Sequence, residues 1–139
     1  MIDDANALEL FRFADPVQSV TLQVACDAPM VSEDESYYAA EIAVESGFIS
    51  GTVGLHISDA DLDEWGQCLD ALESDEGVEW PPGGRSAWLS VVPEDPLEVT
   101  VHDSPSTQIA VQIPVDVPTG WLEENRLRLE HVRKATAKR

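Results

Sequence analysis

Residues 37–65 have the sequence YYAAEIAVESGFISGTVGLHISDADLDEW, which contains the clearest secondary-structure signals of the chain. Apolar side chains alternate with small or polar ones from Tyr38 to Val44 and again from Ile49 to Ile57. A period of two residues is typical of a strand that buries one face. Ser46-Gly47 lies between the two runs and is the signal of a tight hairpin turn. The stretch therefore predicts two neighbouring antiparallel strands.

The spacing changes at Ser58, where a helix is predicted to begin. Ser58 is a suitable N-cap residue, and Asp59 and Asp61 supply the negative charge that stabilises a first helical turn. We expect the helix to end near Ser74, before Gly77. Apolar residues recur at helical spacing within it and predict a stripe that faces a core: Leu62, Trp65, Leu69 and Leu72.

Further loops, strands and a second helix are predicted on both sides of residues 37–65. Residues 27–36 contain Pro29 and a cluster of acids, so we expect an exposed loop there. Pro114 indicates that the last predicted strand lies at a sheet edge or leaves the ladder. A second helix is predicted to begin near Trp121, and alternation predicts further strands at residues 8–13, 20–26, 78–80, 87–91, 97–101 and 109–115.

These elements follow the order ββββαβββα and predict an α+β fold. We expect two layers: one mainly antiparallel sheet of about seven strands, with both helices packed on one face. A chain of 139 residues, of which 43% are hydrophobic, is long enough to bury one core, so residues 1–133 are expected to form a single domain. Residues 134–139, KATAKR, have no apolar stripe and are expected to form a basic flexible tail.

The charge is distributed very unevenly along the sequence. Residues 1–125 hold 26 of the 27 acidic residues and two of the eight basic ones, while residues 126–139 hold the other six basic residues and one acid. An acidic body of this kind repels nucleic acid and anionic membranes and attracts basic surfaces. The same acidity is also typical of whole proteomes of GC-rich or salt-adapted organisms, where it serves solubility alone.

Nothing in the sequence predicts secretion or a membrane span. The start, MIDDANALELF, has neither the basic segment nor the apolar stretch of a signal peptide, and no segment approaches the roughly 20 apolar residues of a transmembrane helix. We therefore expect a soluble cytoplasmic protein.

The sequence contains no pattern that predicts a reaction. Glu41 and Glu45 are about 13 Å apart along one predicted strand, too far for the paired carboxylates of a glycosidase. The acids from Asp59 to Asp63 have the spacing that opens an EF-hand loop, but Glu64 replaces the glycine that this loop needs. No histidine has a second metal ligand at the usual spacing, and no nucleophile elbow is present. We expect no enzyme, no metal and no cofactor.

Four tryptophans raise the possibility of an interface anchor. Trp65 and Trp121 fall on apolar stripes and are expected in the core. Trp88 alternates with apolar neighbours and is expected on the solvent-facing side of the sheet. Trp80 precedes the Pro-Pro-Gly-Gly turn, and together with Trp88 it would form a pair of exposed indoles on an acidic face.

Residues 37–65, together with GRSAWLSV at 84–91 and VQIPVDVPTGWLEENRLRLEHVR at 111–133, resemble a family of small, acidic, functionally uncharacterised proteins of actinobacteria such as streptomycetes. The resemblance covers roughly residues 8–133. More distantly, roughly residues 37–115 resemble WapI-type immunity proteins, which neutralise contact-delivered toxins. Both resemblances imply a single-domain binder without a cofactor, and neither implies a catalytic residue.

We therefore expect a non-catalytic, acidic protein-binding domain. An immunity or inhibitor protein that neutralises a basic toxin fits the size and the charge, and a cytoplasmic regulatory or scaffold module fits them equally well. An enzyme or a small-molecule binder remains an alternative, with a site assembled only in three dimensions. The residues expected to contact the partner are acids of the predicted loop, strand and helix together with one indole: Glu33, Asp34, Glu35, Glu41, Glu45, Asp63, Glu64, Asp70 and Trp88.

Overall fold

The computed structural model describes residues 7–26, 29–32, 34–82, 87–104 and 106–137. These residues form nine strands and two helices. The helices are α1 (Asp59–Glu73) and α2 (Trp121–Ala137). The strands are β1 (Ala7–Ala14), β2 (Ser19–Ala25), β3 (Met30–Ser32), β4 (Glu35–Glu45), β5 (Ser50–Ser58), β6 (Val78–Trp80), β7 (Ala87–Val92), β8 (Leu97–Asp103) and β9 (Ile109–Val115).

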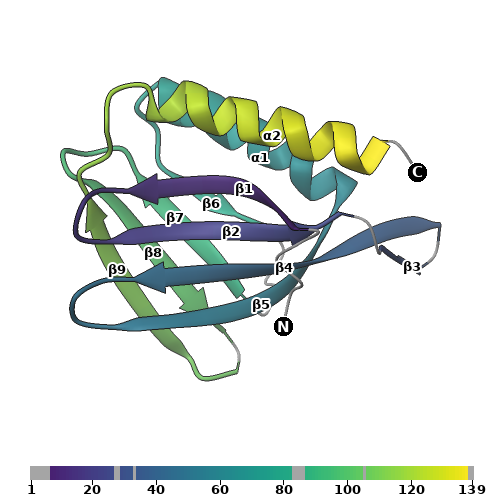
Figure 1. The fold of residues 1–139 in the computed structure, drawn as a ribbon, viewed down its shortest axis with the longest axis horizontal. Helices are drawn as coiled ribbons and strands as arrows, with labels where there is room; N and C mark the ends of the chain where they lie inside the picture. Colours follow the sequence, from purple (N-terminus) through teal and green to yellow (C-terminus); the bar gives the residue numbers. More distant parts are fainter. Residues whose placement is uncertain (1–6, 27–28, 33, 83–86, 105, 138–139) are drawn as a thin grey trace.

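The strands form two antiparallel sheets, which cross face to face (Figure 1). In the first sheet the order is β1-β2-β4-β5, and the short β3 pairs with the start of β4. In the second sheet the order is β6-β7-β8-β9. The predicted α+β class and the antiparallel pairing are confirmed, but the predicted single sheet is wrong. Alternation reveals which side chains share a face and does not reveal which strands pair, so the sequence pattern is compatible with one sheet or two.

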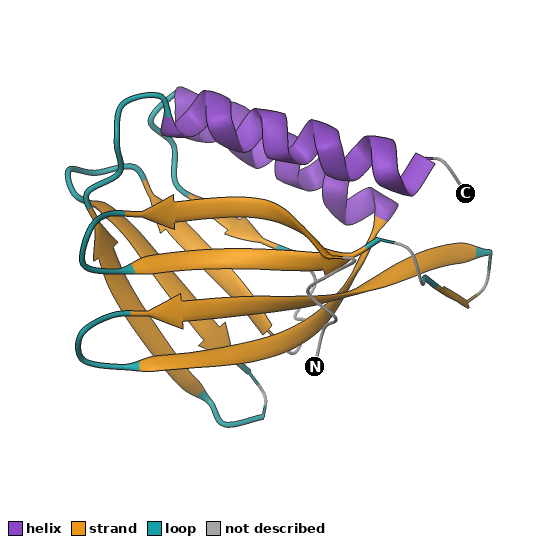
Figure 2. Ribbon diagram, in the orientation of Figure 1, coloured by secondary structure: helices purple, strands orange, loops and turns teal. Residues whose placement is uncertain are grey.

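Each half of the chain is one sheet followed by one helix. The helices lie side by side along the edge of the sandwich formed by β1 and β6 (Figure 2). The segment predicted as a loop at residues 27–36 contains β3 and the first residues of β4, which the structure pairs as a short hairpin. Three residues with two exposed apolar side chains give too little alternation to identify such a strand.

The core lies between the two sheets. The inward residues of the first sheet are almost completely buried, among them Leu22, Ile42 and Ile57, and so are Leu89 and Val99 of the second sheet. The apolar face of the first sheet was expected to pack against helix α1. It is covered mainly by the second sheet, because one narrow helical stripe is too small to cover a face of this width.

Helix α1 begins with the predicted N-cap. The N–H of Asp61 donates to the Ser58 hydroxyl at 3.2 Å, and the Asp61 carboxylate accepts from the N–H of Ser58 at 2.9 Å, which together form a capping box. The predicted apolar stripe is buried throughout. Its Trp65 ring packs against Phe11 at 5.0 Å and against Trp80 at 5.3 Å between ring centroids, so the helix is joined to both sheets.

Helix α2 closes the outer edge of β1. The backbone N–H of Arg12 donates to Oδ1 of Asn125 at 2.9 Å, and Nδ2 of Asn125 donates to the Arg12 carbonyl at 3.3 Å. Asn125 is fully buried. The side-chain amide therefore replaces the hydrogen bonds that a further strand would make to Arg12, and the packing of α2 along β1 covers this edge.

The first four residues of the expected flexible tail, 134–137, belong to a helix in the structure. Helix α2 continues through Ala137, and Thr136 is buried with its hydroxyl donating to the Arg133 carbonyl at 3.1 Å. The last two residues lie outside the described part of the chain. Within that part, neither helix combines the length and the apolar composition that crossing a membrane requires.

The turn between β1 and β2 is tied to the segment that follows β9. The carboxylate of Asp15 accepts from the N–H groups of Val17 and Gln18 within the turn and from the N–H of Asp116 at 2.9 Å. The N–H of Asp116, followed by those of Gln18 and Val17, lowers the pKa of Asp15 despite the opposing effect of burial. The anionic form of Asp15 therefore helps to hold the two sheets together.

We predict that Asn125→Ala lowers the free energy of unfolding by about 1–3 kcal/mol, because the N–H and the carbonyl of Arg12 lose their partner. Urea denaturation measures the change. Leu127→Ala on the exposed side of the same helix serves as the control and should change stability by less than about 0.5 kcal/mol. Equal effects of the two substitutions would show that the amide contributes nothing specific.

The stabilising effect of Asp15 should depend on pH. Because its folded-state pKa is lowered, its contribution is present above its unfolded pKa of about 3.9 and is lost as the pH falls through the folded value. The difference in unfolding free energy between the wild type and Asp15→Asn should therefore be constant near neutral pH and shrink below about pH 4. A difference that is the same at pH 3 and pH 7 contradicts the role of the anion.

Candidate partner-binding surface

The residues expected to contact a partner are distributed over several surfaces. Asp34 and Glu35 lie at the hairpin between β3 and β4, and Glu33 lies outside the described residues. Trp88 is on the outer side of the second sheet. The other acids divide between the outer face of β4, which carries Glu41 and Glu45, and helix α1, which carries Asp63, Glu64 and Asp70. One continuous interface cannot include all of them.

The structure brings Glu35 of the hairpin close to the start of α1. Burial, followed by the carboxylates of Asp63 and Glu35, raises the pKa of Asp59. The hydroxyl of Tyr38 donates to the Asp59 carboxylate at 3.4 Å. This concentration of negative charge is not visible in the sequence, because 24 residues separate Glu35 from Asp59.

Two of the helix acids are paired within the molecule. Nη1 of Arg133 lies 2.7 Å from Asp63, and Nη1 of Arg126 lies 2.8 Å from Asp70, while Nη2 of Arg126 also pairs with Glu73 at 2.6 Å. These pairs are exposed and each adds little stability, but they give Asp63, Asp70 and Glu73 of α1 a counter-charge. The basic end of the sequence is therefore the counter-charge of the helical layer.

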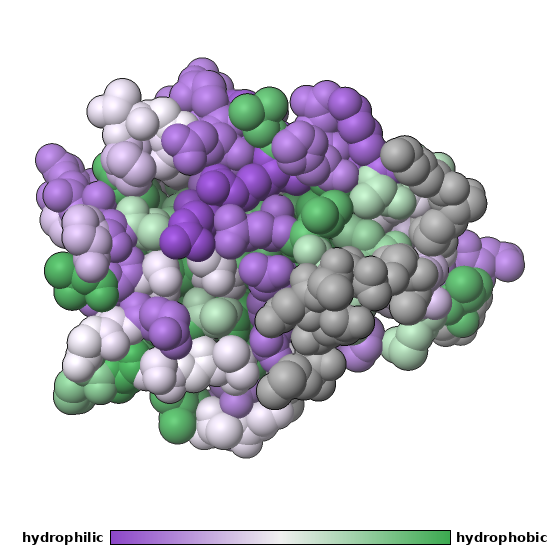
Figure 3. Space-filling model, in the orientation of Figure 1, coloured by the Kyte–Doolittle hydropathy of each residue, from purple (hydrophilic) through white to green (hydrophobic). Residues whose placement is uncertain are grey.

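The remaining basic residues of the described chain also pair with acids of the same molecule. Arg128 pairs with Glu9 at 3.0 Å, Arg12 pairs with Glu9 at 3.4 Å, and Lys134 pairs with Glu130 at 3.4 Å. Every Lys and Arg side chain that the structure describes is on β1 or α2 and makes an ion pair. Figure 3 shows the hydrophilic side chains concentrated over this layer.

The outer face of the first sheet has a different composition. Glu41 lies opposite Gly54 in β5 and opposite Gln23 in β2, and Glu45 lies opposite Ser50 and Ser19. Neither carboxylate has an ion-pair partner among the described residues, and no Lys or Arg occurs on β2, β4 or β5. Small or polar residues thus surround two carboxylates that have no ion-pair partner among the described residues.

The expected pair of exposed indoles does not exist. Trp80 is fully buried, and its indole N–H donates to the Asp61 carbonyl at 2.7 Å. Trp88 is half-buried and stacks on His102 of β8, with ring centroids 3.7 Å apart and planes 4° from parallel. The neighbour in β8 is set by the strand register, which the sequence pattern does not specify. Trp88 also faces away from the first sheet, so it cannot act together with Glu41 and Glu45.

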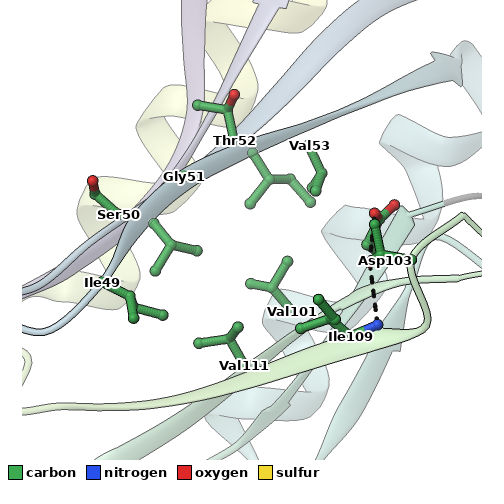
Figure 4. Close-up of a pocket in the computed structure, with 12 residues that line it drawn as sticks. Ile49, Ser50, Gly51, Thr52, Val53, Val101, Asp103, Ile109 and Val111 are labelled. Carbon is green, nitrogen blue, oxygen red and sulfur yellow. Dashed lines mark hydrogen bonds between the residues drawn. The ribbon is translucent and has the colours of Figure 1, made fainter.

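Sequence reasoning missed a cavity of about 290 Å³ between the sheets. It lies on the side of the sandwich opposite the helices (Figure 4). Apolar side chains form most of its wall, and Asp103 and Thr107 also line it. The signal in the sequence is Gly51, which interrupts the inward apolar series of its strand. The apolar wall comes from both sheets: Ile42, Val44, Ile49, Val53, Val101, Ile109 and Val111.

Neither a metal centre nor an activated thiol is found within the described residues. No group of three or more His, Cys, Asp or Glu side chains there is arranged to hold a metal ion. Cys26 is buried and Cys68 is half-buried. Burial, with a smaller contribution from the Glu64 carboxylate, raises the pKa of Cys68 to about 11. A thiol of this pKa is protonated at neutral pH and is a poor nucleophile.

We predict that Cys68 in a Cys26→Ala background reacts slowly with iodoacetamide at pH 8 in the folded protein. The rate should rise steeply only as the pH approaches 11, because the thiolate is the reacting form. In denaturant the rate at pH 8 should become that of an ordinary cysteine with a pKa of about 8.5. Equal rates for the folded and the denatured protein at pH 8 contradict the raised pKa.

Comparison with known proteins gives a family and a distant fold neighbour. No curated protein matches this chain in sequence. A solved structure described as "Structure of the plant transcriptional regulator PBF-2" is similar with a TM-score of 0.49 and 13% sequence identity, over 94% of this chain and 80% of that chain. Residues 8–137 match the model of a protein family described as "Family of unknown function (DUF5959)". Because the match spans nearly the whole chain, this protein belongs to the DUF5959 family.

Proposed function

We propose that this chain is a non-catalytic protein-binding domain that captures a basic protein partner through the outer face of its first sheet. The residues that attract the partner are Glu41 and Glu45. Asp63 and Asp70, which the sequence pattern also nominated, contribute less because each already has an arginine partner.

The separation of charge is the observation that carries this proposal. The chain has a formal net charge of -19, yet the described Lys and Arg residues all pair with acids on the β1 and α2 side. The carboxylates of Glu41 and Glu45 on the outer face of the first sheet, by contrast, have no such partner among the described residues. A surface of one sign raises the association rate of an oppositely charged protein by about 10- to 1,000-fold at low salt.

We further propose that the partner is a toxin and that the chain acts as its immunity protein in the cytoplasm. The resemblance to actinobacterial proteins and, more distantly, to WapI-type immunity proteins motivates this assignment. An inhibitor must bind before a toxin acts, and fast electrostatic capture serves that need. The substrates of many toxins are nucleic acids, and toxins that bind them carry basic surfaces, which an acidic sheet complements.

The proposal predicts that a basic toxin domain is encoded beside this chain's gene, and the matching experiment uses that domain. Co-expression should restore growth to cells that produce the toxin. In stopped-flow measurements the double variant Glu41→Lys with Glu45→Lys should associate about tenfold more slowly at low salt, with a flatter salt dependence, because the attracting charge is reversed.

The matched control is Glu76→Lys with Glu94→Lys. These two exposed acids lie in connections outside the sheet faces, have no ion pair among the described residues, and change the net charge by the same amount. Equal slowing by both double variants would mean that only net charge matters. A partner whose association is indifferent to salt and to both variants would overturn the proposal.

A further inference from the structure

Among the sheet edges in the described residues, the edge at β5 is the longest and has no proline in it. The edge at β1 is covered by α2, whose Asn125 bonds to Arg12. At β9, Pro114 lacks an N–H and its carbonyl accepts a hydrogen bond from the Gln18 side chain. Strand β6 has three residues and packs against α1. Strand β5 has nine residues in unbroken register with β4, and it contains no proline, lysine or bulge to discourage further pairing.

The register of the β4–β5 hairpin identifies the backbone groups at this edge. The N–H of Ser46 donates to the Ile49 carbonyl at 2.9 Å, so this pair is hydrogen-bonded. Hydrogen-bonded pairs alternate along an antiparallel ladder, so the N–H and carbonyl groups of Ser50, Thr52 and Gly54 point away from β4. All three residues are exposed, and their outward backbone groups have no hydrogen-bond partner in the described part of the chain.

The cavity lies directly inward of the same edge. Gly51 and Val53 of β5 face it from one side, and Val111 and Ile109 of β9 face it from the other (Figure 4). Ile109 is 60% exposed although it belongs to the inward series of its strand. A volume of about 290 Å³ is at or below the lower limit for small-molecule pockets and suits a few apolar side chains.

The carboxylates of Glu41 and Glu45 lie beside the same edge, on the outer face of the sheet, whereas the cavity lies on its inner face. Glu41 is opposite Gly54, and Glu45 is opposite Ser50, so only small groups separate the carboxylates from a strand placed beside β5. Such a strand would lie about 10 Å from β4, because neighbouring strands are about 4.8 Å apart. Lysine or arginine side chains of that strand are long enough to meet a glutamate across this distance.

We propose that the β5 edge receives an extended strand of a basic partner. Its outward side chains include Lys or Arg residues that pair with Glu41 and Glu45, and its alternate, inward side chains are apolar and fill the cavity. Because side chains alternate between faces, the guest segment has basic residues four positions apart with apolar residues between them. This inference rests on the proposed protein-binding function and adds the mode of binding. The added strand does not come from a second copy of this chain, because that copy would bring another net charge of -19 close to Glu41 and Glu45.

The test uses the capped, fluorescently labelled peptide Lys-Val-Thr-Val-Lys-Val-Thr and the full chain. The peptide should bind, and the amide hydrogens of Thr52 and Gly54 should exchange more slowly in the complex because they become hydrogen-bonded. Two further peptides measure the contributions of the apolar and the basic side chains separately. One has Thr in place of every Val, and the other has Gln in place of every Lys. Both should bind about tenfold more weakly or worse.

Two substitutions in β5 test the edge directly. A Cβ added at Gly51 meets no atom within 4 Å, so Gly51→Val should fold and partly fill the cavity. Thr52→Pro removes one outward N–H at an edge position where proline is tolerated. Each should weaken binding of the peptide by about tenfold or more. Gly47→Val is the matched control, because Gly47 lies in the hairpin turn, outside the cavity, and its added Cβ also meets no atom within 4 Å. Thermal unfolding verifies that all three variants are folded.

The outcomes distinguish the mode of binding from the function. Unprotected Thr52 and Gly54 amides in the complex, wild-type affinity of Gly51→Val, or equal binding of the peptide without Val would each overturn strand addition. So would a dimer of this chain that Thr52→Pro dissociates. If the toxin domain still binds and responds to reversal of Glu41 and Glu45 but ignores Gly51→Val and Thr52→Pro, strand addition is wrong and the proposed function stands.

Discussion

The structure depends on the mutual burial of two apolar sheet faces. Each half of the chain supplies an antiparallel sheet with one apolar face and one helix with a narrow apolar stripe, and neither helix is wide enough to cover the sheet that precedes it. The two faces therefore cover each other, and the helices close one side of the sandwich. Trp65, packed against Phe11 and Trp80, joins all three layers. The opposite side has no helix, which is why the cavity is there.

The charged residues also differ between the side of the sandwich that the helices cover and the opposite side. The amphipathic helices pack side by side, and their exposed faces carry opposite charges that pair across the interface, as Arg126 and Arg133 do with Asp70 and Asp63. Along the edge that α2 covers, Asn125 makes two hydrogen bonds with Arg12. Where no helix packs, the edge of β5 is open and the carboxylates of Glu41 and Glu45 have no counter-charge among the described residues. An open edge on a neutral protein would favour self-association, whereas on this chain repulsion between copies opposes it.

Local periodicity was sufficient for most of the elements. The hairpin around Ser46, the N-cap at Ser58 and the buried stripe through Leu69 follow from residue spacing and were predicted correctly. Periodicity failed where a segment was short, as in β3, or where the pattern faded, as at Thr136, which is held in α2 by packing. Of the candidate site, the outward position of Glu41 and Glu45 was predictable, because alternation assigns a face to each strand residue.

The α+β class, the antiparallel hairpins, the faces of the strands and the acidic character of the surface follow from the amino-acid sequence. These properties depend on neighbours within a few residues and on composition. The division of the strands into two sheets, the burial of Trp80 and the stacking of Trp88 on His102 follow from long-range packing. Which acids are paired and which edge remains open also follow from long-range packing, because these depend on contacts such as that between Arg133 and Asp63, 70 residues apart in the chain. The energy of such a contact depends on where packing brings the two groups, and no local pattern specifies that position.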